Sequence, residues 1–145
     1  MIEDNAKVRD SGPGSLAAHI ETGGVSFAGD EPVDVGGTGT GPGPYDLLCA
    51  ALAECTALTV RLYADRKAWP LTAIEVGVRH EKTPEESPPD LFHRRIALEG
   101  PLDDEQRARL MQIAEHCPVH RTLVAGSRIE TRAAEPPPTP ASSRP

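Results

Sequence analysis

The sequence predicts an α+β domain in which short strands and a strand pair surround one long, apolar helix. Three observations support this prediction. Glycine-rich turns separate three short strand-like runs near the amino terminus. A long apolar segment of helical periodicity follows, and the second half alternates between strand and helix patterns. The resulting order, β-β-β-α-β-β-α-α-β, is typical of the α+β class, and 145 residues fit one domain.

The amino-terminal runs, residues 6–9, 16–21 and 25–28, predict three strands joined as a meander. The next stretch, residues 32–44, contains five glycines and three prolines. It lacks the lysine of a phosphate-binding loop, and no strong strand precedes it. We therefore interpret residues 32–44 as an irregular segment that leads the chain to the start of the helix.

The central helix is predicted over residues 45–67 and follows Pro44, which suits a first helical turn. Asp46 places a negative charge at the positive end of the helix dipole. Spacings of 4, 3, 4 and 3 predict one buried stripe, made of Leu48, Leu52, Cys55, Thr59 and Leu62. Such a helix spans roughly 34 Å. Because it is apolar over most of its surface, we expect a sheet or a partner chain to cover it.

Strand patterns return after this helix. Residues 71–80 alternate strictly between apolar and polar side chains, which predicts a half-buried strand. Residues 92–98 alternate less cleanly and predict its partner in a hairpin with a long, charged loop. A final strand is predicted over residues 127–131.

Two shorter helices and a tail complete the prediction. One helix is expected over residues 105–116 and a second over residues 118–124, which begins with a proline. Residues 133–145 contain five prolines and no core-forming residue, so they predict a disordered tail. The folded unit is therefore expected to be a single domain of residues 1–132.

Composition excludes several classes of protein. A net charge of −7 and the absence of a basic run argue against a nucleic-acid partner. No apolar segment follows a basic amino terminus, so no secretory signal is predicted. Glu54 and Arg61 interrupt the apolar helix, so we expect no membrane span. Three cysteines, an odd number, indicate free thiols in a cytoplasmic protein.

Cys117 directly precedes Pro118, which predicts that it caps the amino-terminal end of a helix. Unpaired backbone N–H groups and the helix dipole favour a thiolate there. His120 and Arg121 follow within one turn and add positive charge. The alternative interpretation is that Cys117 is a small buried residue at a helix junction, because free cysteines are commonly buried.

A second thiol, Cys55, lies on the predicted buried stripe of the central helix. One activated thiol and one placed to condense with its oxidised form are what a thiol peroxidase requires. A metal site formed by Cys55, Cys117 and His120 is an alternative, but the usual paired-ligand spacings are absent, so no metal is expected. Cys49 lies about 120° from Cys55 around the helix and is interpreted as a core residue.

Five motifs together resemble the OsmC/Ohr family of small thiol peroxidases, and its OsmC-like branch more closely than its organic hydroperoxide resistance branch. They are GGTGTGPGPYDLL (36–48), the segment around Cys55 (51–71), VRHEK (78–82), ALEGPLDDEQRARL (97–110) and CPVHRTL (117–123).

The resemblance implies an intertwined homodimer whose antiparallel sheets wrap around long central helices. It also implies reduction of organic hydroperoxides without a cofactor, with Cys55 as the attacking thiol and Cys117 as the resolving thiol. A dithiol of the lipoyl type is the implied reductant. The residues alone favour Cys117 as the thiolate, whereas the resemblance assigns the attack to Cys55.

The family also implies an activating pair that this sequence carries in altered form. A glutamate normally follows the proline at the helix start and holds an arginine from the amino-terminal strands. Here Tyr45 occupies the glutamate position, Asp46 comes next, and Arg9 is the only arginine before the helix. These differences favour an alternative function, in which a non-catalytic dimer of the same fold binds an apolar small molecule between its subunits.

Overall fold

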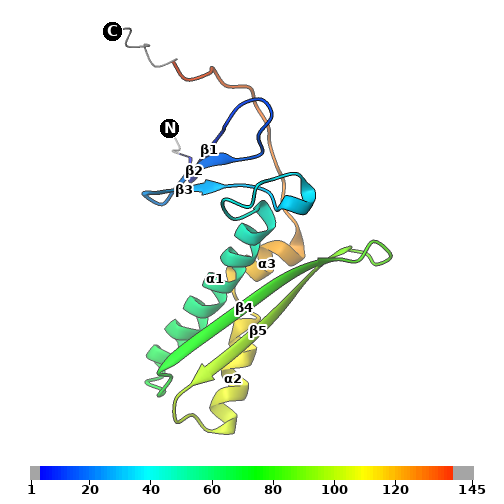
Figure 1. The fold of residues 1–145 in the computed structure, drawn as a ribbon. Helices are drawn as coiled ribbons and strands as arrows, with labels where there is room; N and C mark the ends of the chain where they lie inside the picture. The colour runs from blue at the N-terminus through cyan, green and yellow to red at the C-terminus, as the bar shows by residue number, and fades with distance from the viewer. Residues whose placement is uncertain (1–3, 139–145) are drawn as a thin grey trace.

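The chain forms two separate antiparallel sheets along one long helix (Figure 1). The computed structural model describes residues 4–138. In chain order the elements are β1 (Ala6–Asp10), β2 (Ala18–Thr22), β3 (Val25–Gly29), the 3-10 helix η1 (Val33–Val35), α1 (Pro44–Arg66), β4 (Ala73–Lys82), β5 (Asp90–Glu99), α2 (Asp104–Ala114) and α3 (Pro118–Ala125). This is the α+β architecture that the sequence predicts.

Strands β1, β2 and β3 form the predicted meander. Their order in the sheet is β1-β2-β3, and Ile20 pairs with Val8 on one side and with Phe27 on the other. Ile20 is the one buried apolar side chain within these three strands. The sheet lies beyond the amino-terminal end of α1 and away from the β4–β5 hairpin (Figure 1). Most of its surface is therefore open within one chain.

The carboxylate of Asp30 organises the glycine-rich segment between β3 and α1. It accepts the backbone N–H and hydroxyl of both Thr38 and Thr40, and also the backbone N–H of Glu31. Gly41 passes so close to the Ala28 carbonyl oxygen that a Cβ there would overlap it. The predicted irregular segment is thus an ordered loop that delivers the chain to α1.

The main core lies beside the carboxyl-terminal half of α1. There α1 packs against β4 on one side and α2 on another. The buried cluster consists of Val60, Ala64, Leu71, Leu102, Leu110, Ile113 and Ala114. Ile74 pairs with Leu98 in the hairpin, and these two half-buried side chains close the cluster together with Ile96. The hairpin and both short helices agree with the predicted elements to within two residues at each end.

The buried face of α1 differs from the predicted stripe. Its buried residues are Leu52, Thr56, Val60 and Ala64, a strict four-residue repeat. Of the predicted stripe, Leu48 and Leu62 are exposed, and Cys55 and Thr59 are half-buried. The prediction was wrong because apolar residues surround most of α1, and periodicity does not tell which row faces the sheet and which lies open.

The predicted strand over residues 127–131 is also wrong. After α3 the chain continues as an exposed segment without helix or strand through residue 138, and Ile129 is 88% exposed. A strand needs a neighbouring strand to accept its backbone hydrogen bonds, and none of the strands within residues 4–138 pairs with this segment. Residues 133–138 belong to the predicted disordered tail, and the rest of that tail lies outside the described residues.

By length and composition, α1 is the one helix in the described part of the chain that could cross a membrane. The core helix of a soluble protein meets the same criterion. In this fold α1 packs against β4, α2 and α3, and it carries Glu54, Arg61 and Asp65 within its length. These contacts are those of a core helix.

Candidate functional site

The structure brings the thiols of Cys55 and Cys117 together. Cys55 lies in the middle of α1, and Cys117 is the N-cap residue of α3, with Pro118 as the first helical residue. Because α1 packs against α3, the two thiols are within hydrogen-bonding reach of each other. Cys117 is fully buried, whereas Cys55 is half-buried. Both are free thiols.

The surroundings of the two thiols separate their proton affinities. Burial acts to raise the pKa of Cys117, but hydrogen bonds from the Cys55 thiol and from the His120 backbone N–H outweigh it. Further hydrogen bonds from the Thr56 hydroxyl and the Val119 backbone N–H contribute, so the pKa of Cys117 falls below its ordinary value. Burial, and then the hydrogen bond to Cys117, raise the pKa of Cys55. The surroundings therefore favour a negative charge on Cys117 over one on Cys55.

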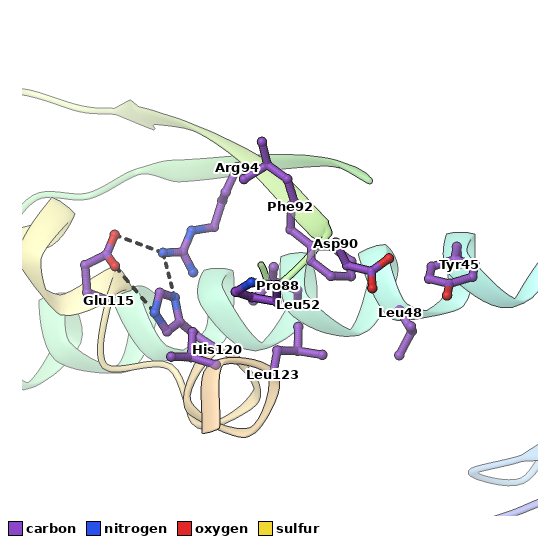
Figure 2. Close-up of a pocket in the computed structure, with 12 residues that line it drawn as sticks. Tyr45, Leu48, Leu52, Pro88, Asp90, Phe92, Arg94, Glu115, His120 and Leu123 are labelled. Atoms are coloured by element: carbon purple, nitrogen blue, oxygen red, sulfur yellow. Dashed lines mark hydrogen bonds and ion pairs between the residues drawn. The ribbon is translucent and has the colours of Figure 1, made fainter. Parts of the chain in front are cut away.

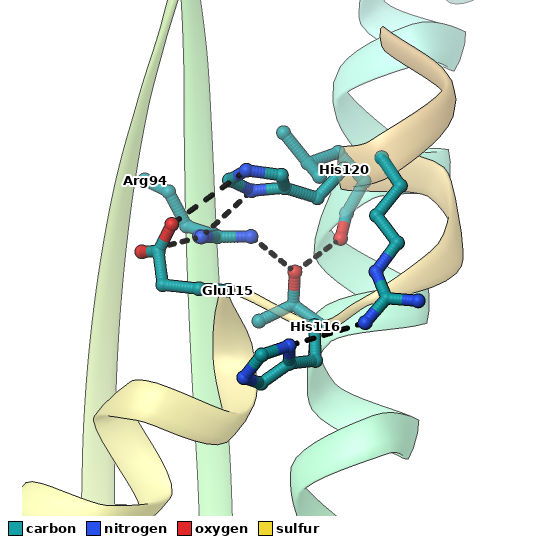
Figure 3. A network of polar contacts seen from close by, with 7 residues as sticks. Arg94, Glu115, His116 and His120 are labelled. Carbon is teal, nitrogen blue, oxygen red and sulfur yellow. Dashed lines mark hydrogen bonds and ion pairs between the residues drawn. The ribbon is translucent and has the colours of Figure 1, made fainter. Parts of the chain in front are cut away.

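A buried arginine, Arg94, joins the elements around this pair. Its guanidinium donates to Thr56 Oγ1 at 3.1 Å, to Glu115 Oε1 at 3.0 Å and to His120 Nδ1 at 3.1 Å. His120 Nε2 lies 3.6 Å from Glu115 Oε2, which closes a ring of three side chains (Figure 3). Because a guanidinium can only donate, His120 Nδ1 accepts, and its ring proton is on Nε2.

Sequence reasoning missed Arg94 and Glu115, although β5 carried a signal. Arg94 has the same parity as Phe92 and Ile96, so it occupies an inward-facing position in an alternating strand. An arginine at such a position needs buried partners. Nothing in the spacing indicated that Glu115 would provide one, since it lies in the turn between α2 and α3.

A pocket of about 780 Å³ lies between α1, β5 and α3. Arg94, Glu115 and His120 form its polar end, and Tyr45 lies at the opposite end (Figure 2). Between them the wall is mainly apolar, and it includes Leu48, Leu52, Phe92 and Leu123. The arrangement suits an apolar molecule with one polar group.

Cys55 borders a different hollow, of about 410 Å³. Residues of α1 and the first two residues of α3 line it: Ala51, Glu54, Cys55, Leu58, Thr59, Leu62, Pro118 and Val119. The hollow is open and largely apolar. A small apolar reactant can therefore reach Cys55 from this side, while Cys117 stays enclosed behind it.

Tyr45 and Asp46, the two residues at the start of α1, have structural partners of their own. The Tyr45 ring stacks on the His80 imidazole, with centroids 4.2 Å apart, and His80 Nε2 lies 2.8 Å from Asp90 Oδ1. Asp46 accepts the backbone N–H of Gly43 at 2.9 Å and so caps the helix. Both residues lie about two and a half turns before Cys55.

Arg9 and Cys49 lie away from the thiol pair, whereas Arg121 follows Cys117 on α3 but its side chain contacts another residue. Arg9 is exposed on β1, in the amino-terminal sheet. Arg121 is exposed and donates to His116 Nδ1 at 3.1 Å. Cys49 borders a separate pocket beside His80, where burial and the charge of Asp46 raise the pKa of its thiol.

The alternative prediction was a metal site formed by Cys55, Cys117 and His120. Within residues 4–138, no three or more side chains of His, Cys, Asp and Glu gather closely enough to hold a metal ion. His120, one of the proposed ligands, already contacts Arg94 through Nδ1.

Several solved structures have a similar fold. A protein named for the osmotic stress and detoxification response of Psychrobacter arcticus is 23% identical, with a TM-score of 0.70 over 84% of this chain and 89% of that one. The organic hydroperoxide resistance protein OsmC of Legionella pneumophila is 22% identical, with a TM-score of 0.63 over 81% and 86%. That of Elizabethkingia anophelis is 16% identical, with a TM-score of 0.64 over 84% and 89%.

At these identities the structural matches show a shared fold. No curated protein sequence matches this chain. The family profile described as OsmC-like protein matches residues 37–132, a span that includes α1, the hairpin, both short helices and both cysteines of the pair. The chain therefore belongs to the OsmC-like family.

Proposed function

We propose that this protein is a thiol peroxidase that reduces organic hydroperoxides through Cys55 and Cys117. The observation that carries the proposal is that the Cys55 and Cys117 thiols are neighbours between α1 and α3, with polar groups around Cys117 that favour its thiolate. The family adds support, because similar structures include proteins named for organic hydroperoxide resistance. An antioxidant role in the stress response of the cytoplasm follows from this chemistry.

The first step is attack by Cys55, which is the more accessible thiol. A proton moves from Cys55 to Cys117 along their hydrogen bond, and the Cys55 thiolate attacks the outer peroxide oxygen. The O–O bond breaks, the alkoxide takes the proton back from Cys117 and leaves as an alcohol, and Cys55 becomes a sulfenic acid. The peroxide has been reduced by two electrons and the sulfur oxidised by two.

The second step closes the disulfide and the third reopens it. The Cys117 thiolate attacks the sulfur of the Cys55 sulfenic acid, the S–O bond breaks, and hydroxide leaves to form water with a solvent proton. A dithiol reductant, which we propose to be of the lipoyl type, then exchanges with the disulfide and restores both thiols. No cofactor takes part in this cycle.

The open hollow beside Cys55 supports an apolar hydroperoxide as the substrate. Exposed leucines on α1 line it, and they also support a homodimer, because a second copy of the chain would cover them. We propose that the enzyme works as this dimer, with neither nucleic acid nor membrane as a partner.

The test is peroxide-dependent disulfide formation. Wild-type protein treated with cumene hydroperoxide is expected to gain one Cys55–Cys117 disulfide, detected by mass spectrometry of the unreduced peptides. Cys55→Ser and Cys117→Ser are each expected to abolish dihydrolipoamide-dependent turnover, whereas Cys49→Ser retains it because Cys49 lies outside the pair. Wild-type protein that forms no disulfide with peroxide would falsify the proposal.

A second candidate is a non-catalytic dimer that binds an apolar molecule. The pocket of about 780 Å³ favours it, as does Tyr45 in place of the family's glutamate. Under this alternative the purified protein retains an apolar compound, and neither thiol of the pair reacts with peroxide. Native mass spectrometry of freshly purified protein distinguishes the two functions.

A further inference from the structure

Arg94 holds together the three segments that enclose Cys117. Its guanidinium contacts Thr56 on α1, Glu115 in the turn before Cys117, and His120 on α3 (Figure 3). The Arg94 side chain is only 10% exposed, and its contacts with Thr56 and His120 are partly buried, whereas Glu115 is exposed. One residue of β5 therefore sets the position of groups that precede, follow and face the resolving thiol.

The contact with Thr56 is the direct link to the sulfur. The Thr56 hydroxyl donates to the Leu52 carbonyl oxygen at 2.7 Å and also lies within hydrogen-bonding reach of Cys117. Because Arg94 donates to the hydroxyl oxygen and the hydroxyl proton is donated to Leu52, this oxygen is a poorer acceptor for the thiol proton of Cys117. A hydroxyl in this state favours a thiolate over a thiol at Cys117.

The other charged and titratable groups near Cys117 come from each neighbouring element. Cys55 faces it from α1, Arg94 from β5, Glu115 and His116 from the turn, and His120 and Arg121 from α3. Glu115 pairs with Arg94 at 3.0 Å, and Arg121 is exposed beside His116. Arg94 is therefore the buried cation of this set.

We propose that Arg94 is a positioning residue for the resolving thiol, and that it acts through Thr56 and His120 to keep Cys117 ready to attack the oxidised sulfur of Cys55. The inference rests on the proposed peroxidase function and concerns its second step. Attack on the sulfenic acid requires an ionised Cys117 at a fixed distance and angle. Arg94 supplies both conditions from within the chain, whereas the family's activating arginine comes from the amino-terminal strands.

The first test measures thiolate formation and needs no peroxide. Ultraviolet thiolate absorbance is followed against pH in a Cys49→Ser background, so that only the pair titrates. Arg94→Met is expected to raise the midpoint of the first step by about one pH unit, because a cation and its donors are removed. Arg95→Met is the matched control, since Arg95 is the next residue of β5, is 72% exposed and pairs with Glu75. Equal midpoints in the two variants overturn the proposal.

The second test separates peroxide attack from disulfide closure. After a pulse of cumene hydroperoxide, the Cys55 sulfenic acid is trapped with dimedone and quantified against the disulfide by mass spectrometry. In Arg94→Met the sulfenic acid, once formed, is expected to close to the disulfide about tenfold more slowly, in proportion to the lost thiolate. Arg94→Lys is expected to restore part of the rate, because it retains the charge and a donor.

Thr56→Val keeps the proposal testable if Arg94→Met fails to fold, since valine matches threonine in shape and removes only the hydroxyl. It is expected to slow closure in the same direction, and Thr56→Ser to retain it. Unchanged closure rates in Arg94→Met, or in Thr56→Val where the former does not fold, overturn the proposal while leaving the peroxidase intact. A wild-type protein that forms no disulfide with peroxide overturns the peroxidase, a result that the titration does not depend on.

Discussion

Three cysteines in this chain have three different environments, and the neighbours of each sulfur decide its chemistry. The pKa of the Cys49 thiol is raised by burial and by the nearby Asp46 carboxylate. The pKa of Cys117 is lowered, because donors surround a sulfur that burial alone would keep protonated. Burial, and then the hydrogen bond to Cys117, raise the pKa of Cys55 as well. Among the three thiols, Cys117 is therefore the one whose surroundings favour the thiolate.

The ionisation of the buried Asp30 carboxyl affects the stability of the folded protein. Hydrogen bonds from the Thr38 hydroxyl, and then from the hydroxyl and backbone N–H of Thr40, hold the pKa of its carboxyl far below the ordinary value of 3.8. Because the folded-state pKa is depressed, the contribution to stability is present above about pH 4 and is lost as the pH falls below it. The loop before α1 should therefore loosen in acid.

Asp30→Asn tests this dependence. In either orientation the amide nitrogen of the asparagine faces a donor, because Oδ1 accepts the backbone N–H of Glu31 and Oδ2 accepts four hydrogen bonds from Thr38 and Thr40. We expect a clearly lower urea midpoint than wild type at about pH 7 and a difference that shrinks toward about pH 3. Asp34→Asn, at an exposed position, is the control. A wild-type minus variant difference that stays constant with pH would contradict the assignment.

At the scale of elements, the sequence predicts where α1 lies more reliably than how it packs. Its start follows from Pro44 and Asp46, and the predicted end is within one residue of Arg66. The choice of buried row depends on β4 and α2, which contact α1 from elsewhere in the chain. Tertiary contact selects one apolar row of α1, and local periodicity cannot show that selection.

The candidate site was likewise predictable from the sequence only in its local features. The N-cap position of Cys117 could be predicted, because a cysteine before a helix-starting proline is a local pattern. The contact between Arg94 and Thr56 joins residues 38 positions apart and depends on how β5 lies over α1. Such a contact follows from the packing of two elements, so strand parity can suggest that Arg94 points inward but cannot name its partners.

Leu110 is the residue through which α2 joins the core. It is fully buried, whereas the next residue, Met111, is 45% exposed. Leu110→Ala is expected to lower the free energy of unfolding by about 2–5 kcal/mol, because it removes buried apolar atoms and leaves a cavity against α1. Met111→Ala should change it by about 0.5 kcal/mol or less. Urea denaturation followed by circular dichroism measures both free energies of unfolding. Equal losses in the two variants would contradict the assignment of Leu110 to the core.

For the whole molecule, the distribution of burial points to a second copy of the chain. The main core lies at one end of α1, while the amino-terminal sheet at the other end buries only Ile20 among its apolar side chains. Leu58 and Leu62, on the open face of α1, are 60% and 52% exposed. Apolar side chains grouped in this way are typical of an interface, and Cys55 opens onto the same face.

The dimer prediction is therefore also a prediction about the site. Light scattering is expected to give twice the chain mass of 15.5 kDa for the wild type. Leu58→Glu combined with Leu62→Glu should shift the mass to that of one chain, because two buried charges would face each other across the interface. Met111→Glu, an equally drastic change on the exposed side of α2, should leave the dimer intact. If the enzyme needs its partner to shelter Cys55, peroxide turnover falls with dissociation in the first variant only. A wild-type protein that is monomeric at micromolar concentration contradicts the prediction. The exposed leucines of α1 would then bind something other than a second copy of the chain.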